Sequence, residues 1–360
     1  MDQPEKAFDE AAAAQLAQQV GMYRLGVLVS AMGHLGGRLG LYAAMRGAGP
    51  LTADEVAERS GLYERWVLEW LRAQAAAGLI DYVGSERFEL TDAQAAVLTD
   101  DASPFCRAHL FRRLPADFLR LEQLPESFQT GLGSSWADLT PAVDDSDSML
   151  AQFHRTELVP VVLPALDGIV DILEAGGKVA DVGCGTGVAL AEIAKAFPNA
   201  DLHGYDPWSE GLQFARRRAT DGGFGNITFH EARAEDIPAD SSFDLVCAMD
   251  CIHDMPHPVE ALTAMRRAVK PGGFLLVIDM KGGASFEENL EAQPLLAAFQ
   301  YSVSVLACLS SGMSEPDGAG LGTLGFDEQT ARRMTAEAGF TRFRALELDH
   351  PFNAAYEVRP

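Results

Sequence analysis

The sequence predicts an α/β fold built around a largely parallel sheet, preceded by a smaller helical domain. The stretch Lys178–Gly187 is an apolar run that ends in alternating glycines, and an amphipathic segment follows it. This is the pattern of strand, tight turn and helix. From Asp171 onward, apolar runs and amphipathic segments alternate, as in a doubly wound sheet. Acidic residues stand at the ends of several runs, where the carboxyl ends of parallel strands line a ligand crevice.

The composition limits the classes of function. The chain has 360 residues, which suits two domains, and 48% of them are hydrophobic. Lys and Arg number 28 against 52 Asp and Glu, so the net charge of −24 disfavours nucleic acids and anionic membranes as partners. No apolar run reaches the length of a membrane span, and Met1–Glu5 shows no signal-peptide pattern. The five cysteines lack metal spacing, so we expect a cytoplasmic protein with free thiols and no metal centre.

The spacing of the glycines narrows the choice of ligand. The turn from Asp181 to Gly187 reads D-V-G-C-G-T-G, so its third glycine comes one residue earlier than in the dinucleotide fingerprint G-x-G-x-x-G. Glycines let the backbone approach a ligand closely, and the following helix offers free N–H groups to an anion. By itself the turn is equally consistent with a tight strand–helix connection that binds nothing.

The residues after the turn point to a nucleoside ligand. Asp206 ends the next apolar run, where an acid can accept two hydrogen bonds from a ribose diol. The acidic segment Ala234–Pro238 follows the third run. Phe243–Met249 then predicts a fourth strand, and Lys270–Gly273 turns into a fifth that ends at Asp279.

This order of motifs resembles the class I S-adenosylmethionine-dependent methyltransferases, which have a Rossmann-like seven-stranded domain. The resemblance implies the strand order 3-2-1-4-5-7-6, with strand 7 antiparallel, and S-adenosyl-L-methionine as cofactor. It also implies that the glycines surround the methionine part of the cofactor, while Asp181 steadies the turn or the methionine ammonium group. Asp206 would hold the ribose, and Asp236 the adenine. The full set of expected cofactor contacts is Phe153, Asp181, Gly183, Gly185, Gly187, Asp206, Glu235, Asp236, Ile237 and Met249.

The N-terminal third resembles a winged helix. Phe8–Met45 has a helical, Ala-rich periodicity, and Thr52 and Glu55 have the spacing of a capping box. Glu64–Ala77 predicts a further helix, and Gly78–Leu90 a hairpin that forms the wing. Between Pro50 and Asp100, ten acidic residues face four arginines, whereas DNA binding needs several phosphate contacts from Lys or Arg. We therefore expect a dimerisation and lid module.

A winged helix ahead of such a domain resembles the small-molecule O-methyltransferases of plants and bacteria. The likeness extends to a poorly characterised bacterial branch through Ile252–Asp254, Gly318–Thr323 and His350–Asn353. It implies a homodimer whose N-terminal domain closes over the substrate. We expect a winged-helix domain over residues 1–100, a helical connector over 101–170 that contributes to the substrate pocket, and a methyltransferase domain over 171–360. Residues 281–325 form a substrate-pocket insertion in that domain.

The candidate catalytic residues are His253 and Asp254, directly after the fourth strand. A phenol has a pKa near ~10, so a neutral histidine is a suitable base for O-methylation. The plant-type enzymes carry H-D-W here, but Met255 replaces the tryptophan, so His253 is either the base or a residue that packs beside the cofactor. Asp254 either orients His253 or caps the helix that begins near His257.

The methyl acceptor is expected to be apolar or aromatic, because aromatic residues are frequent in the segments that would line the pocket. O-methylation is favoured, with N-, S- and C-methylation open. Two other functions remain as alternatives: a winged-helix transcriptional regulator with a metabolite effector, and a degenerate protein that binds the cofactor without catalysis.

Overall fold

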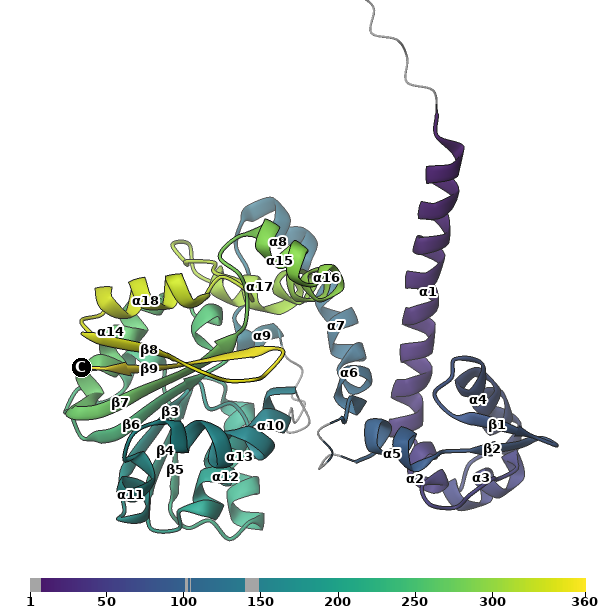
Figure 1. Cartoon of the computed structure of the whole chain (residues 1–360), viewed down its shortest axis with the longest axis horizontal. Helices are drawn as coiled ribbons and strands as arrows, with labels where there is room; N and C mark the ends of the chain where they lie inside the picture. Colours follow the sequence, from purple (N-terminus) through teal and green to yellow (C-terminus); the bar gives the residue numbers. More distant parts are fainter. Residues whose placement is uncertain (1–7, 101–102, 104, 140–148) are drawn as a thin grey trace, which may run out of the picture. The chain divides into compact units, whose positions relative to one another are not determined.

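The computed structural model describes residues 8–100, 103, 105–139 and 149–360. The segment Met1–Glu5 lies outside the described residues. The chain divides into two compact units, residues 1–115 and 116–360. The division falls inside the range that the sequence assigns to a connector (Figure 1).

The first unit contains the winged helix that the sequence predicts. The capping box is present, because Thr52 Oγ1 accepts from the Glu55 N–H and Glu55 Oε2 accepts from the Thr52 N–H. The wing pairs Asp81 with Glu89, and Phe88 is buried in the core of the unit. The elements of this unit are α1 (Glu10–Arg38), α2 (Leu41–Met45), α3 (Ala53–Ser60), α4 (Glu64–Ala76), β1 (Asp81–Gly84), β2 (Arg87–Glu89), α5 (Asp92–Leu98) and α6 (Ala108–Arg112).

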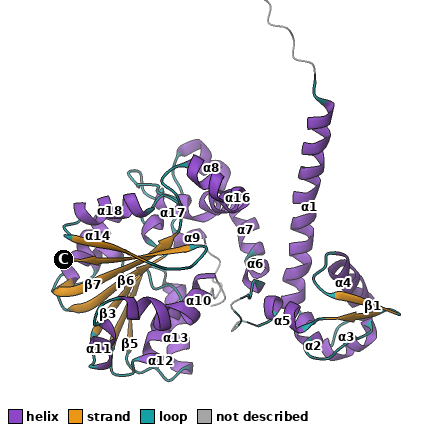
Figure 2. Cartoon of the chain, viewed as in Figure 1, coloured by secondary structure: helices purple, strands orange, loops and turns teal. Residues whose placement is uncertain are grey.

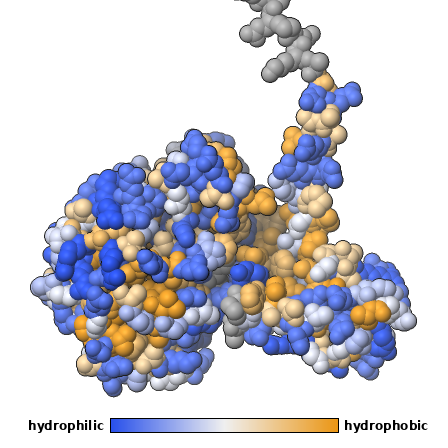
Figure 3. Space-filling view, viewed as in Figure 1, coloured by the Kyte–Doolittle hydropathy of each residue, from blue (hydrophilic) through white to orange (hydrophobic). Residues whose placement is uncertain are grey.

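Helix α1 is long and carries apolar residues that the first unit does not cover. Four residues of its apolar periodicity are about half exposed or more: Leu16, Val20, Tyr23 and Leu28. Apolar and polar residues are interspersed along its surface (Figure 3). The helix therefore buries little apolar area within its own unit.

The second unit is built on a seven-stranded sheet in the order β5-β4-β3-β6-β7-β9-β8. Strands β3, β4, β5, β6 and β7 are parallel to one another, whereas β9 is antiparallel to both of its neighbours, β7 and β8. In chain order this arrangement is 3-2-1-4-5-7-6, so the predicted topology is confirmed. The strands are β3 (Lys178–Val182), β4 (Asp201–Asp206), β5 (Ile227–Glu231), β6 (Phe243–Met249), β7 (Val269–Met280), β8 (Arg342–Leu346) and β9 (Asn353–Arg359).

Helices cover both faces of this sheet (Figure 2). Alternate residues of β3 face opposite layers, so Val179 belongs to one hydrophobic cluster and Ala180 to the other. The first cluster includes residues of α11 (Ile169–Glu174), α12 (Val188–Ala196) and α13 (Ser209–Asp221); the second includes residues of α14 (Pro258–Ala268) and α18 (Glu328–Glu337). Because β3, β4 and β6 run parallel to one another, their carboxyl ends lie at one edge of the sheet.

Apart from two short helices that follow β5 and β6, the remaining helices of the second unit come from the predicted connector and insertion. One helical stretch, Pro294–Gly312, is long and apolar enough to cross a membrane by length and composition, with a mean hydropathy of 1.4. Of this apolar window, 44% is buried inside the fold. The helices of the connector and the insertion are α7 (Leu114–Leu121), α8 (Leu124–Thr130), α9 (Trp136–Leu139), α10 (Met149–Phe153), η1 (His154–Val162), η2 (Leu163–Ala165), α15 (Phe286–Ala292), α16 (Pro294–Val303), η5 (Ser304–Cys308) and α17 (Leu309–Gly312).

Candidate active site

The three glycines of the turn after β3 do not all have the same surroundings. All three have positive φ, at 74° for Gly183, 50° for Gly185 and 73° for Gly187. A Cβ atom at Gly183 would lie 2.8 Å from Cys251 Sγ, and one at Gly187 would lie 2.9 Å from Ala215 Cβ. A Cβ at Gly185 would meet nothing within 4 Å. Packing therefore requires the outer two glycines, whereas the middle one borders open space in which a ligand can lie.

Asp206, at the end of β4, holds the turn in place. Its two carboxylate oxygens accept hydrogen bonds from the backbone N–H groups of Gly185 at 2.7 Å and Trp208 at 2.8 Å. A carboxylate oxygen can accept more than one hydrogen bond, so these contacts leave acceptor capacity for a ribose hydroxyl. The structure thus gives Asp206 a second task, support of the turn, that the sequence pattern did not indicate.

Asp181 is a buried carboxyl group with an unused acceptor. It is 2% exposed, and its Oδ1 has no hydrogen-bond partner among the described residues. Burial, with the nearby charge of Asp206, raises the pKa of Asp181 to about 8. An ammonium group would supply both a donor and a positive charge. The turn and this carboxyl group therefore fit the methionine half of S-adenosylmethionine.

The other predicted cofactor residues divide into buried and open positions. Phe153 and Met249 lie in the first hydrophobic cluster and Ile237 in the second. Glu235 and Asp236 belong to the short helix η3 (Ala234–Asp236). Asp236 is exposed, and Glu235 pairs with Arg233 at 3.4 Å. The structure does not bring these acidic side chains into direct contact with the glycine turn.

His253 lies in η4 (Ile252–Asp254) and is fully buried between carboxylates. Its Nδ1 is 2.6 Å from Asp279 Oδ1 near the end of β7, and its Nε2 is 3.4 Å from Asp254 Oδ1. Burial by itself lowers the pKa of His253, but Asp279 and Asp254 outweigh it, so the pKa of His253 lies well above its usual value. Cys251, which contacts the glycine turn, directly precedes η4, so His253 lies close to that turn.

The sequence interpretation missed two partners of His253. Asp279 was identified only as a strand end, although the carboxyl ends of neighbouring parallel strands must meet at one edge. Cys308 comes from η5, and no pattern in the sequence indicates its place. The side chains of His253, Asp254 and Cys308 offer ligand atoms within 4.8 Å of one another, so they are also a candidate metal cluster.

The interpretation of Asp254 as a helix cap is wrong. The N-cap of α14 is His257, and no side chain caps this helix. Asp254 instead faces His253 from the buried side of the turn, and its Oδ1 has no hydrogen-bond partner within the described part of the chain. The short helix η4 turns the backbone before α14 begins, which directs Asp254 inward.

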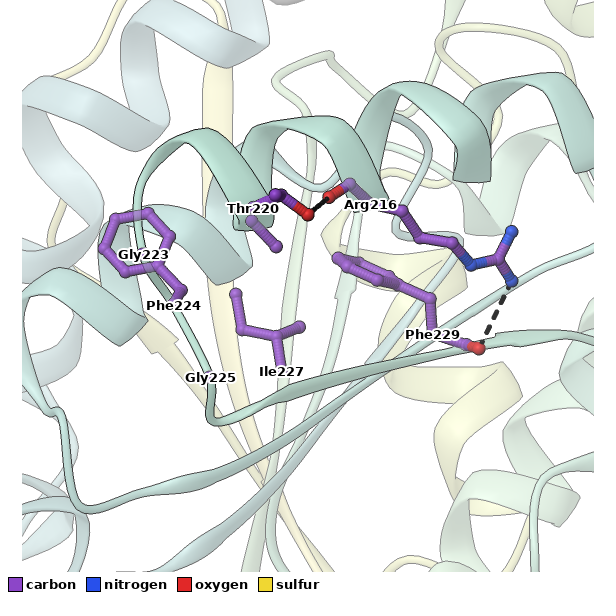
Figure 4. A pocket seen from close by; sticks show the side chains of 8 residues that line it. Arg216, Thr220, Gly223, Phe224, Gly225, Ile227 and Phe229 are labelled. Carbon is purple, nitrogen blue, oxygen red and sulfur yellow. Dashed lines mark hydrogen bonds between the residues drawn. The ribbon is translucent and has the colours of Figure 1, made fainter.

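A surface groove lies between α13 and β5 (Figure 4). Arg216 of α13 donates to the Phe229 carbonyl at 3.4 Å across this groove. None of the predicted cofactor or catalytic residues is among its lining residues, which are Arg216, Ala219, Thr220, Gly223, Phe224, Gly225, Ile227 and Phe229. The groove is therefore separate from the candidate active site.

Comparison with known proteins identifies both domains of the chain. Residues 173–339 match the model of a methyltransferase domain, and residues 25–100 match the Rv2258c-like winged HTH domain. A ubiquinone biosynthesis O-methyltransferase of Paracidovorax citrulli is 31% identical over 175 residues, which are 48% of this chain and 67% of that protein.

Two solved structures share the fold over nearly the whole chain. Mitomycin 7-O-methyltransferase MmcR has a TM-score of 0.66 and 22% identity, with 98% of this chain and 99% of that chain covered. The O-methyltransferase NcsB1 from neocarzinostatin biosynthesis, in complex with S-adenosylmethionine and 2-hydroxy-5-methyl naphthoic acid, has a TM-score of 0.61 and 21% identity. That comparison covers 93% of this chain and 96% of the other.

The sheet topology, the glycine turn and the acids at its edge define an enzyme domain that binds a nucleoside cofactor. The chain belongs to the class I S-adenosylmethionine-dependent methyltransferases and carries an N-terminal winged-helix domain. S-adenosylmethionine is its cofactor.

Proposed function

We propose that this enzyme transfers the methyl group of S-adenosylmethionine to an oxygen atom of a small aromatic acceptor, with His253 as the general base. The contact of His253 Nδ1 with Asp279 Oδ1 at 2.6 Å carries this proposal. A histidine that is held through one ring nitrogen can use the other to accept a proton. The candidate base is Nε2, on the side of Asp254.

The chain's own residues bind and orient the cofactor in this proposal. The backbone at Gly185 borders the methionine part, and Asp181 accepts from its ammonium group. Asp206 accepts from the ribose hydroxyls, and Asp236 of η3 meets the adenine amino group. The bound cofactor supplies a methyl group that its sulfonium already activates, so the remaining task is alignment and removal of one proton.

The charges around His253 determine when it can act as a base. The two carboxylates favour the protonated form of the imidazole, because they raise the pKa of His253. A positive charge bound nearby opposes this effect and lowers the pKa again. Loss of the ring proton therefore becomes easier once a cationic cofactor occupies the neighbouring turn.

An aromatic acceptor is supported by two observations. NcsB1, which shares this fold, was crystallised with a naphthoic acid. The insertion carries exposed aromatic side chains, among which Phe286 and Tyr301 have ring centroids 5.6 Å apart. Aromatic rings stack favourably on such side chains.

A homodimer is the second part of the proposal. The apolar residues that α1 leaves exposed in its own unit need a partner surface, because uncovered apolar patches mark protein interfaces. A second copy of this chain would supply it. Sedimentation equilibrium should give twice the chain mass, and replacing both Leu16 and Val20 by Glu should shift the mass toward that of one chain.

The winged helix is not favoured as a DNA-binding surface. Three of its arginines form ion pairs inside the domain: Arg65 pairs with Glu69, Arg72 with Glu86, and Arg87 with Glu55. Each pair removes a positive charge that a phosphate would need. A gel shift at low salt should therefore show no retarded complex.

Two measurements test the proposed activity. Calorimetric titration with S-adenosylhomocysteine should show micromolar binding that Asp206→Ala abolishes. Turnover should then be measured on a panel of phenols, thiols and amines, with phenols expected to react fastest. Binding without turnover of any phenol would contradict O-methylation, and absence of binding would contradict the enzymatic function itself.

A further inference from the structure

A network of charged residues links the segment that carries Asp236 to the insertion. Arg233 directly precedes η3, and its Nη1 donates to Glu315 Oε1 at 2.7 Å. The other oxygen of Glu315 lies 2.9 Å from Nε2 of His257, the N-cap of α14. One carboxylate thus joins three segments that are far apart in the sequence.

The network continues on both sides of Glu315. Arg233 also donates twice to Glu235, each time at 3.4 Å. His257 faces Glu315, and its Nε2 lies 3.9 Å from Asp317 Oδ1 of the insertion. The negative charge of Glu260 on α14 also acts on His257. The positive charge of Arg233 therefore lies between two carboxylates, while His257 is surrounded by acids.

The backbone of the same region is held independently of these charges. The N–H of Ala319 donates to the Pro256 carbonyl at 2.8 Å, and that of Gly318 donates to the Glu315 carbonyl at 2.9 Å. Ala234 and Ile237 anchor η3 in the hydrophobic core beneath it. Removal of the Glu315 charge should therefore leave the fold intact while it loosens the adenine side of the site.

We propose that Glu315 is a positioning residue for the cofactor: through Arg233 and His257 it holds η3 where Asp236 meets adenine. This inference rests on the proposed contact between Asp236 and adenine. Through Glu315, the insertion that contributes to the acceptor pocket also sets the affinity for the cofactor. Isolated exposed ion pairs contribute little, but this carboxylate bridges two partners and is about two-thirds shielded, with 35% of its side chain exposed.

The contribution of Glu315 to cofactor affinity should depend on pH, because His257 gains or loses a proton. Glu315 raises the pKa of His257 above its usual value despite partial burial, with Asp317 and Glu260 adding to the effect. The attraction between His257 and Glu315 is therefore fully present below the ordinary histidine pKa. It weakens as the pH rises through the raised value.

The test is calorimetric titration of the full chain with S-adenosylhomocysteine at pH 6.0, 7.0 and 8.5. Glu315→Gln should weaken binding about three- to tenfold at pH 6.0, and the ratio to wild type should shrink toward pH 8.5. His257→Gln should remove this pH dependence. Glu337→Gln is the matched control, because it breaks a comparable exposed pair with Arg333 on α18, and it should leave affinity unchanged.

Steady-state kinetics and a double variant separate positioning from a general structural role. Glu315→Gln should raise KM for S-adenosylmethionine with little change in kcat. Arg233→Met combined with Glu315→Gln should cost less than the sum of the single changes, since both remove one interaction. Equal affinities of Glu315→Gln and Glu337→Gln at every pH would overturn the inference. No binding by wild type would instead overturn the proposed function.

Discussion

Two turns at the same edge of the sheet are built differently. One is the glycine turn after β3, residues 183–187; the other, here called the histidine turn, is η4 after β6 and carries His253. The glycine turn is local, because its conformation follows from three glycines within five residues and from one acid at the end of the next strand. The histidine turn is assembled from distant parts, since His253 meets Asp279 from β7 and Cys308 from the insertion. Local sequence thus encodes the turn that we propose binds the cofactor, while tertiary contacts determine the state of the candidate base.

The largest expected effect tests the histidine turn. His253→Ala should lower kcat about 10²- to 10⁴-fold, the usual contribution of a general base. The affinity for S-adenosylhomocysteine should change little, because the glycine turn is intact. His203→Ala, which removes a histidine of β4 whose side chain is 16% exposed, is the control and should keep kcat. An unchanged kcat in His253→Ala would show that this residue only packs beside the cofactor.

The next effect separates folding from binding within the glycine turn. Gly185→Val should weaken binding of S-adenosylhomocysteine at least about 100-fold, or ~2.7 kcal/mol, because the side chain enters the open space beside the turn. Its cost in unfolding free energy should be only the ~1–2 kcal/mol of a left-handed backbone. Gly183→Val should destabilise the fold more, since its Cβ would lie 2.8 Å from Cys251 Sγ. Equal thermal stability of the two variants would contradict this division.

A smaller effect concerns the charge on His253. In wild type, kcat/KM should rise with pH through the raised pKa of His253, because only the neutral imidazole accepts a proton. Asp279→Asn removes a carboxylate that raises this pKa, so the profile should move to lower pH by at least about one unit. A pH–rate profile measures the shift. A shift to higher pH, or none, would exclude Asp279 as the partner of the base.

The smallest expected effect is the release of a proton from Asp181 when a ligand binds at the glycine turn. The pKa of Asp181 is about 8, so this group is mostly protonated at pH 7. An ammonium group favours its ionised form, so ligand binding should release up to about one proton at pH 7. Titrations in buffers with different ionisation enthalpies measure this release. Asp181→Asn should abolish it, and an equal release in both proteins would place the ammonium elsewhere.

The two turns also show how far sequence reasoning reaches. The sheet order and the positions of Gly183, Gly185 and Gly187 could be predicted, because strand periodicity and glycine spacing are local signals. The acids near the carboxyl ends of β3 and β4, Asp181 and Asp206, could be placed at one edge for the same reason. The role of Asp254 could not be predicted, since capping and inward orientation differ by a few backbone angles that only the packed turn determines.

The sequence by itself determined the doubly wound fold, the glycine turn with its acids, and the acidic winged helix that precedes them. Each of these follows from periodicity, backbone freedom or charge within a short stretch of chain. Only the tertiary structure decided that Asp279 and Cys308 flank His253, and that Glu315 joins Arg233 to His257. These contacts join segments that are far apart in the sequence. Around His253, burial also strengthens them enough to shift proton equilibria.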